Sequence, residues 1–143
     1  MSDAPTPEAL AGRWDRGLAA YAKLFGIEPS EVFATLSRRS GRRMATEAVL
    51  SAGSGVWDDD ALSLRERRIV VIAALTTQGA VERLANHIEQ AVAEGLTVAE
   101  LDAVMHLLAL YAGFPRATIA MNAARRTLVS MGVVPESEAP DVP

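Results

Sequence analysis

The chain has 143 residues, of which half are hydrophobic and only 5% are aromatic, and its formal net charge is −4. This acidic balance argues against a nucleic-acid-binding protein, which would show a concentrated positive surface, and the absence of cysteine excludes disulfides, thiolate metal sites and thiol catalysis. The abundance of alanine and leucine favours helices over sheets, and the length favours one domain.

The distribution of apolar residues gives no indication of a membrane protein. The first residues are polar and lack the hydrophobic core of a signal peptide. The longest apolar run, residues 69–75, is too short to cross a bilayer. We therefore expect a cytoplasmic protein without a nucleic-acid or membrane partner. We assign residues 1–7 to a disordered tail, residues 8–132 to one helical domain and residues 133–143 to a flexible acidic tail.

The first half of the chain shows helical periodicity. Apolar residues at spacings of three and four predict a helix over residues 7–25 that ends before Gly26. Ser30 is expected to cap a short second helix, and a third is expected over residues 43–52. A glycine-rich loop follows and contains Trp57, which either plugs the core or forms one wall of a pocket.

Four arginines occur within residues 37–43. One interpretation is a solvated turn or an oligomer contact. The other is an anion site, because guanidinium groups bind carboxylates through two parallel hydrogen bonds. Arg42 is the member of this run that we consider as a substrate-binding residue.

A capping box at Ser63 predicts a helix that runs to about residue 78. Its segment 69–75 is apolar on all sides, so we expect this helix to be the most buried element. Three arginines, Arg65, Arg67 and Arg68, lie in its first two turns. Because the helix dipole disfavours cations in the first turn, we expect acidic partners for some of them.

The expected partners are the acids nearest to these arginines in the sequence: Asp58, Asp59, Asp60 and Glu66.

Three more helices are predicted in the second half. The first covers residues 80–93 and ends at Gly95. The second follows a capping box at Thr97, covers residues 98–112 and contains His106 and Tyr111. The last begins near Pro115.

His87 lies within the apolar stripe of the helix predicted over residues 80–93. It is three residues after Leu84 and four before Ala91, so all three share one face. A histidine in this position either packs in the core or takes part in chemistry. The sequence contains only one other histidine, and two histidines without a supporting acidic pattern do not indicate a metal site.

Residues 63–128 resemble the carboxymuconolactone decarboxylase family, which includes the alkyl hydroperoxidase accessory proteins. The resemblance rests on several motifs and their order along the chain. These are Leu62-Ser63-x-x-x-Arg67, Ile72-Ala-Ala-Leu75, His87-x3-Ala91-x-x-Glu94-Gly95, Leu96-Thr-x-x-Glu100-Leu and His106-x4-Tyr111-Ala-Gly-Phe-Pro-Arg-Ala.

The resemblance implies an all-α, single-domain bundle of six to seven helices. It also implies a homo-oligomer, usually a trimer or hexamer, with a pocket near the helix that carries His87. No cofactor and no metal are expected. The expected partner is a small-molecule carboxylate or lactone.

The same resemblance separates two branches of the family. The peroxidase branch uses a Cys-x-x-Cys-x-x-x-His motif, whose cysteine positions are Ala80 and Arg83 in this chain. Dithiol peroxidase activity is therefore excluded, because neither side chain forms a thiolate. The decarboxylase branch typically has Glu-Leu-x-x-His, and Arg83 replaces that glutamate. The nearest acid on this side is Glu82, one residue earlier and about 100° further around the helix.

Decarboxylation without a cofactor needs a group that holds a carboxylate, a donor for the developing oxyanion and an acid. We assign His87 and Glu82 as the catalytic candidates, since imidazole titrates near neutrality. The substrate-binding candidates are Arg83, His106, Tyr111, Trp57 and Arg42. The resulting hypothesis is a carboxymuconolactone decarboxylase-like lyase of aromatic-compound catabolism or a related pathway. The alternative is a non-catalytic oligomeric member that binds a small ligand or has a structural role.

Overall fold

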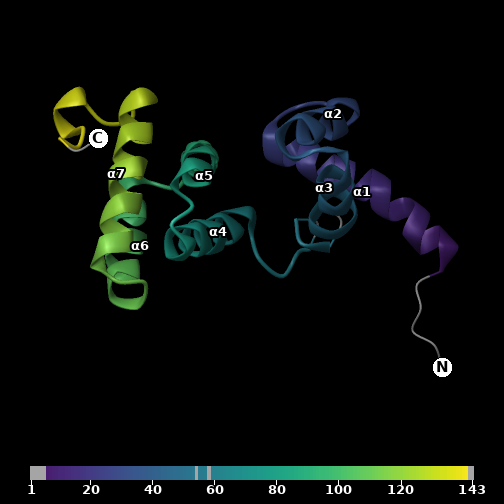
Figure 1. The fold of residues 1–143 in the computed structure, drawn as a ribbon, viewed down its shortest axis with the longest axis horizontal. Coiled ribbons are helices and arrows are strands. Elements are labelled where there is room, and N and C mark those ends of the chain that lie inside the picture. Colours follow the sequence, from purple (N-terminus) through teal and green to yellow (C-terminus); the bar gives the residue numbers. More distant parts are fainter. Residues whose placement is uncertain (1–5, 54, 58, 142–143) are drawn as a thin grey trace. The chain divides into compact units, whose positions relative to one another are not determined.

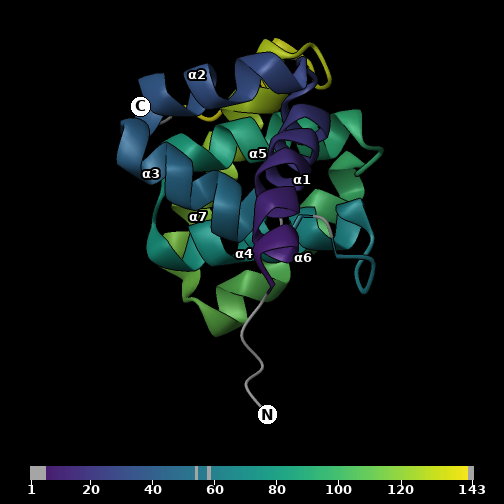
Figure 2. The same cartoon turned by 90° about the vertical axis from the view of Figure 1, so that its right-hand side faces the viewer.

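A computed structural model of the protein describes residues 6–53, 55–57 and 59–141. Every regular element within these ranges is a helix (Figures 1 and 2), so the all-α prediction is confirmed, as is the number of helices. The chain divides into two compact units, residues 1–61 and residues 62–143. The expected single domain over residues 8–132 stays a prediction.

The first unit contains helices α1 (Pro7–Phe25), α2 (Pro29–Ser40) and α3 (Arg42–Glu47), followed by a π-helical segment, η1 (Ala48–Gly53). α1 packs against both α2 and η1. The bounds of α1 agree with the prediction, whereas α2 is capped by Glu28 rather than by Ser30. The helix predicted over residues 43–52 begins as an α-helix and widens into η1.

Gly17 allows α1 to approach η1 closely. A Cβ atom added to Gly17 would lie 2.1 Å from the backbone oxygen of Val49, far inside contact distance. Gly12, one and a half turns earlier in α1, would meet only the end of the flexible Arg16 side chain. The two glycines of one helix therefore differ in their tolerance of a side chain.

We predict that Gly17→Ala lowers the free energy of unfolding by about 1–3 kcal/mol, because the backbone of η1 must move to admit the methyl group. Gly12→Ala is the matched control and should raise stability by about 0.5–1 kcal/mol through its better helix propensity. Chemical denaturation followed by circular dichroism measures both. Equal effects of the two substitutions would contradict the close approach.

The second unit contains α4 (Leu64–Gln78), α5 (Val81–Ala93), α6 (Val98–Tyr111) and α7 (Phe114–Ser130), with a short 3₁₀ helix, η2 (Glu136–Glu138), near the end. In Figure 1 these elements run from teal to yellow. α7 packs against both α5 and α6, and α4 packs against α5. The centre of the core consists of fully buried aliphatic side chains from all four α-helices: Ile72, Leu84, Ile88, Leu101, Met105, Ala120, Ala124 and Leu128.

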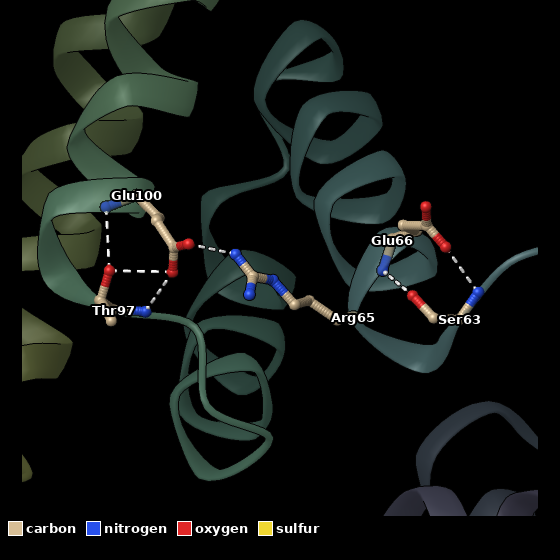
Figure 3. A network of polar contacts seen from close by, with 5 residues as sticks. All are labelled: Ser63, Arg65, Glu66, Thr97 and Glu100. Atoms are coloured by element: carbon tan, nitrogen blue, oxygen red, sulfur yellow. Dashed lines mark hydrogen bonds and ion pairs between the residues drawn. The ribbon is translucent and has the colours of Figure 1, made fainter.

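Both capping boxes of this unit form as predicted, at the starts of α4 and α6 (Figure 3). The hydroxyl of Ser63 accepts a hydrogen bond from the backbone N–H of Glu66, and Thr97 does the same for Glu100. Arg65 reaches from α4 to the carboxylate of Glu100, so it links the two caps. Its partner is thus an acid of α6 rather than one of the acids nearest in the sequence.

α4 is less buried than its apolar composition predicts. Val70 is 57% exposed, and the helix buries instead a stripe with a spacing of four residues: Arg68, Ile72 and Thr76. The most buried position of an apolar helix therefore includes a charged side chain. The candidate site is built around this charged side chain, Arg68.

Residues 133–141 belong to the expected flexible tail, whose flexibility stays a prediction, and two of them contact the second unit. Val134 is buried in the core of the second unit, and Glu138 pairs with Arg125 of α7. Residues 142–143, and residues 1–5 of the expected N-terminal tail, lie outside the described ranges. None of the described helices has the length and apolar character needed to span a membrane.

Candidate active site around His87

The site begins with Arg68, whose side chain has no exposed surface. Arg68 lies in the second turn of α4 and faces α5 along the stripe that it shares with Ile72. A charged group without solvent contact is very unfavourable unless its charge is balanced and its N–H groups are bonded. The partners of Arg68 therefore determine whether this part of the fold is stable.

Glu94 supplies the balancing charge from the C-terminal end of α5. Nε of Arg68 lies 3.0 Å from Oε2 of Glu94, and Nη2 lies 2.9 Å from Oε1, which is a bidentate arrangement. The carboxylate is 21% exposed, so one side of the pair contacts solvent. An acid at a helix C-terminus is disfavoured by the helix dipole, and the Arg68 charge offsets that effect.

His87 is the third member of this group. Nη1 of Arg68 lies 3.1 Å from Nδ1 of His87. His87 and Glu94 are seven residues apart, which is two helical turns, so both face α4 and one guanidinium group contacts both. His87 is half-buried beside the buried Leu84, Ile88 and Ala91. We refer to Arg68, His87 and Glu94 as the buried triad.

The environment of His87 favours its neutral form. Burial lowers the pKa of His87 below its ordinary value of 6.5, and the positive charges of Arg68 and Arg83 lower it further. The charge of Glu94 acts in the opposite direction but is the weakest of these influences. His87 is therefore expected to be uncharged at neutral pH.

A groove of about 280 Å³ lies at the N-terminal end of α5 and is lined by residues 79–83. Glu82 and Arg83 both line it, and both are exposed. Arg83 is four residues before His87 and so lies on the same face of α5. Glu82 does not share that face, and the ring of His87 contacts Arg68. The N-terminus of a helix and an arginine are both suited to an anion.

His106 and Tyr111 lie elsewhere in the second unit. His106 is exposed and lines a separate groove of about 260 Å³ between α6 and α7, with Met105, Phe114 and Met121 among its walls. Tyr111 ends α6 and is 83% exposed. Neither residue lines the groove at the start of α5.

The two remaining candidates belong to the first unit. Arg42 begins α3, and its guanidinium group lies 5.3 Å from the ring centre of Phe33, a cation–π contact. Trp57 is half-buried in the segment after η1. The buried triad and both grooves lie entirely within the second unit.

Two members of the buried triad were not among the candidates from sequence. Acids close in the sequence were expected as partners for some of Arg65, Arg67 and Arg68, and Glu94 entered only as part of a motif. The spacing of seven between His87 and Glu94 was a usable indication, because it places both on one face of a helix. Within the described ranges, no three histidine or acidic side chains gather as a metal site requires.

Comparisons with known proteins agree with the motifs. Residues 45–126, more than half of the chain, match the model of the carboxymuconolactone decarboxylase family. A stretch of 81 residues is 32% identical to a 4-carboxymuconolactone decarboxylase of Acinetobacter baylyi. The match covers 57% of this chain and only 60% of that relative's length.

We predict that Glu94→Gln lowers the free energy of unfolding by about 3 kcal/mol, because it leaves the buried Arg68 without a carboxylate. Arg65→Gln is the control on the same helix. It removes the exposed pair with Glu100 and should cost less than about 1 kcal/mol. Urea denaturation at neutral pH compares the two. A cost for Glu94→Gln as small as that of the control would contradict the role of the buried pair.

Proposed function

The chain belongs to the carboxymuconolactone decarboxylase family, and on this premise we propose that it is a cofactor-free carboxy-lyase. Its proposed substrate is a small cyclic carboxylate or lactone, with 4-carboxymuconolactone as the first compound to test. The observation that carries the proposal is the position of His87. Arg68, held in a buried ion pair, contacts its imidazole, and His87 follows one helical turn after Arg83, which lines an anion-suited groove at the start of α5.

We assign the groove at the N-terminus of α5 to the substrate carboxylate. Arg83 offers a guanidinium fork, and the first backbone N–H groups of α5 carry the positive end of the helix dipole. In this role Arg83 takes the position where the decarboxylase branch typically has glutamate. Arginine in place of glutamate turns the negative charge at this position into a positive one. A positive charge near His87 favours a more anionic ligand.

The reaction breaks the bond between the ring carbon and its carboxylate. The electron pair of this bond passes into the ring and onto the lactone oxygen as CO2 leaves. The ring carbon then takes up one proton from solvent for each CO2 released. His87 is the proposed donor to the developing anion. Glu82 lines the groove and is proposed to orient the water that delivers the proton.

His106, Tyr111, Trp57 and Arg42 remain proposed substrate-binding residues. His106 and Tyr111 lie outside the groove at the start of α5. We assign them to substrate contact in the assembled oligomer, where the end of α6 from one copy adjoins the site of another.

An exposed apolar face supports this assembly. Three residues at the end of α6, Leu107, Leu110 and Tyr111, and the first residue of α7, Phe114, are each more than half exposed. Apolar surface of this extent on a soluble domain marks an interaction site. We propose that this face contacts a second copy of the chain in a trimer or hexamer.

We predict that the purified protein releases CO2 from 4-carboxymuconolactone or from a related cyclic carboxylate. His87→Ala should lower the rate by at least about 100-fold, the usual cost of removing one donor to a developing anion. Glu89→Ala, at an exposed position on the opposite side of α5 from His87, should retain the wild-type rate. Coupled detection of CO2 measures all three proteins.

Background rates for the wild type across a panel of lactones and cyclic carboxylates would contradict the lyase. If such a protein still bound these anions and lost that binding with Arg83→Ala, the non-catalytic ligand-binding alternative would take its place. Calorimetric titration with the same panel separates these outcomes.

For the assembly, we predict that Leu110→Asp converts the oligomer into smaller species, because an aspartate in a buried apolar contact is left without a partner. Val133→Asp also places a charge on an exposed apolar residue, but one that follows the C-terminal end of α7, and should leave the oligomer intact. Light scattering after size-exclusion chromatography measures the mass. A monomeric wild type would contradict the assembly.

A further inference from the structure

We infer that Arg68 is a positioning residue that fixes the tautomer of His87, so that a neutral imidazole presents its Nε2–H to the ligand. This inference rests on the proposed function for its catalytic meaning. Its structural content concerns only which nitrogen of His87 carries the proton.

The guanidinium group of Arg68 determines which nitrogen of His87 can carry a proton. Arginine has five N–H donors and no acceptor, and it stays charged in proteins. An Arg68 Nη1 atom 3.1 Å from Nδ1 of His87 can therefore only donate. Nδ1 must then hold a lone pair rather than a proton, which places the single proton of the neutral ring on Nε2.

The position of Arg68 is itself strongly constrained. Its Nε and Nη2 atoms are both bonded to Glu94, and its side chain is fully buried. Rotation of the guanidinium away from His87 would break the bidentate pair inside the core. Glu94, two helical turns after His87, therefore holds the Arg68 donor against Nδ1 through the ion pair.

A second proton on His87 is opposed from two sides. The charged groups that act on the ring are Arg68 from α4, Arg83 from one end of α5 and Glu94 from the other. A proton on Nδ1 would point directly at Nη1 of Arg68 and would break their hydrogen bond. Only Glu94 favours the imidazolium, and its carboxylate is already bonded to Arg68.

This assignment specifies the role of His87 in the proposed reaction. The neutral ring holds Nε2–H toward the oxygen on which negative charge develops, and it keeps that proton throughout. Such a donor binds an oxyanion without needing acidic conditions. An imidazolium acid would instead lose activity as the pH rises through its pKa.

The test is a long-range ¹H–¹⁵N correlation spectrum of the ¹⁵N-labelled wild type. The chain has two histidines, so the spectrum of His106→Gln assigns the signals of His87. At neutral pH we expect an unprotonated Nδ1 and a protonated Nε2. Lowering the pH should protonate the ring only below its ordinary pKa of 6.5. A proton on Nδ1, or an imidazolium at neutral pH, would overturn the inference.

Two variants separate positioning from stability. Arg68→Met removes the donor and should give a mixture of tautomers with a raised pKa for His87. Glu94→Gln weakens the anchor of the guanidinium but keeps Arg68 as a donor, so the Nε2–H tautomer should remain the major form, with a smaller loss than in Arg68→Met. If Arg68→Met does not fold, the spectrum of the wild type remains decisive.

Activity gives an independent measurement. If CO2 is released, kcat/KM should not fall as the pH rises through 6.5, whereas an imidazolium acid would lose about tenfold per pH unit. Failure to find any CO2 would contradict the proposed function and leave the tautomer result standing. A wrong tautomer in an active enzyme would contradict only the role of Arg68.

Discussion

A guanidinium group without solvent contact is the constraint on which the second unit depends. Arg68 occupies a position that an apolar helix normally gives to leucine or isoleucine, directly in line with Ile72. Replacing a buried ion pair with well-packed apolar side chains is often neutral or stabilising. Stability alone therefore does not account for Arg68, and its contact with His87 suggests a functional reason for it.

The pair also connects elements that must stay in register. Arg68 belongs to α4, while His87 and Glu94 lie two turns apart on α5. A shift of α5 by one turn along α4 would separate the guanidinium from both partners. The hydrogen bonds of Arg68 therefore fix the position of α5 along the axis of α4. They hold the imidazole near the N-terminal half of α5, where Arg83 and the helix dipole provide positive potential.

Much of this fold was predictable from local rules. The two capping boxes, at Ser63 and Thr97, set the starts of α4 and α6 within a residue, because a cap depends only on neighbours three positions apart. The apolar stripe of α5 likewise identified Leu84 and Ile88 as core residues. These features need no knowledge of which helices pack together.

The interactions between distant helices were not predictable in this way. The sequence places several acids close to Arg68, yet Glu94, which pairs with it, is 26 residues away at the end of another helix. The close approach of Gly17 to Val49 likewise depends on how α1 meets a π-helical segment. Composition suggested that segment 69–75 was the most buried, but the exposure of Val70 depends on which faces of α4 the neighbouring helices cover.

The most direct test of the account is a crystal structure of the assembled protein with a five-membered-ring carboxylate such as 2-furoate. The account predicts the ligand carboxylate at Arg83 and the first N–H groups of α5. A ligand oxygen should lie within hydrogen-bonding distance of Nε2 of His87, while Arg68 stays at Nδ1. A ligand bound away from α5, or a His87 ring turned so that Nε2 faces Arg68, would contradict it.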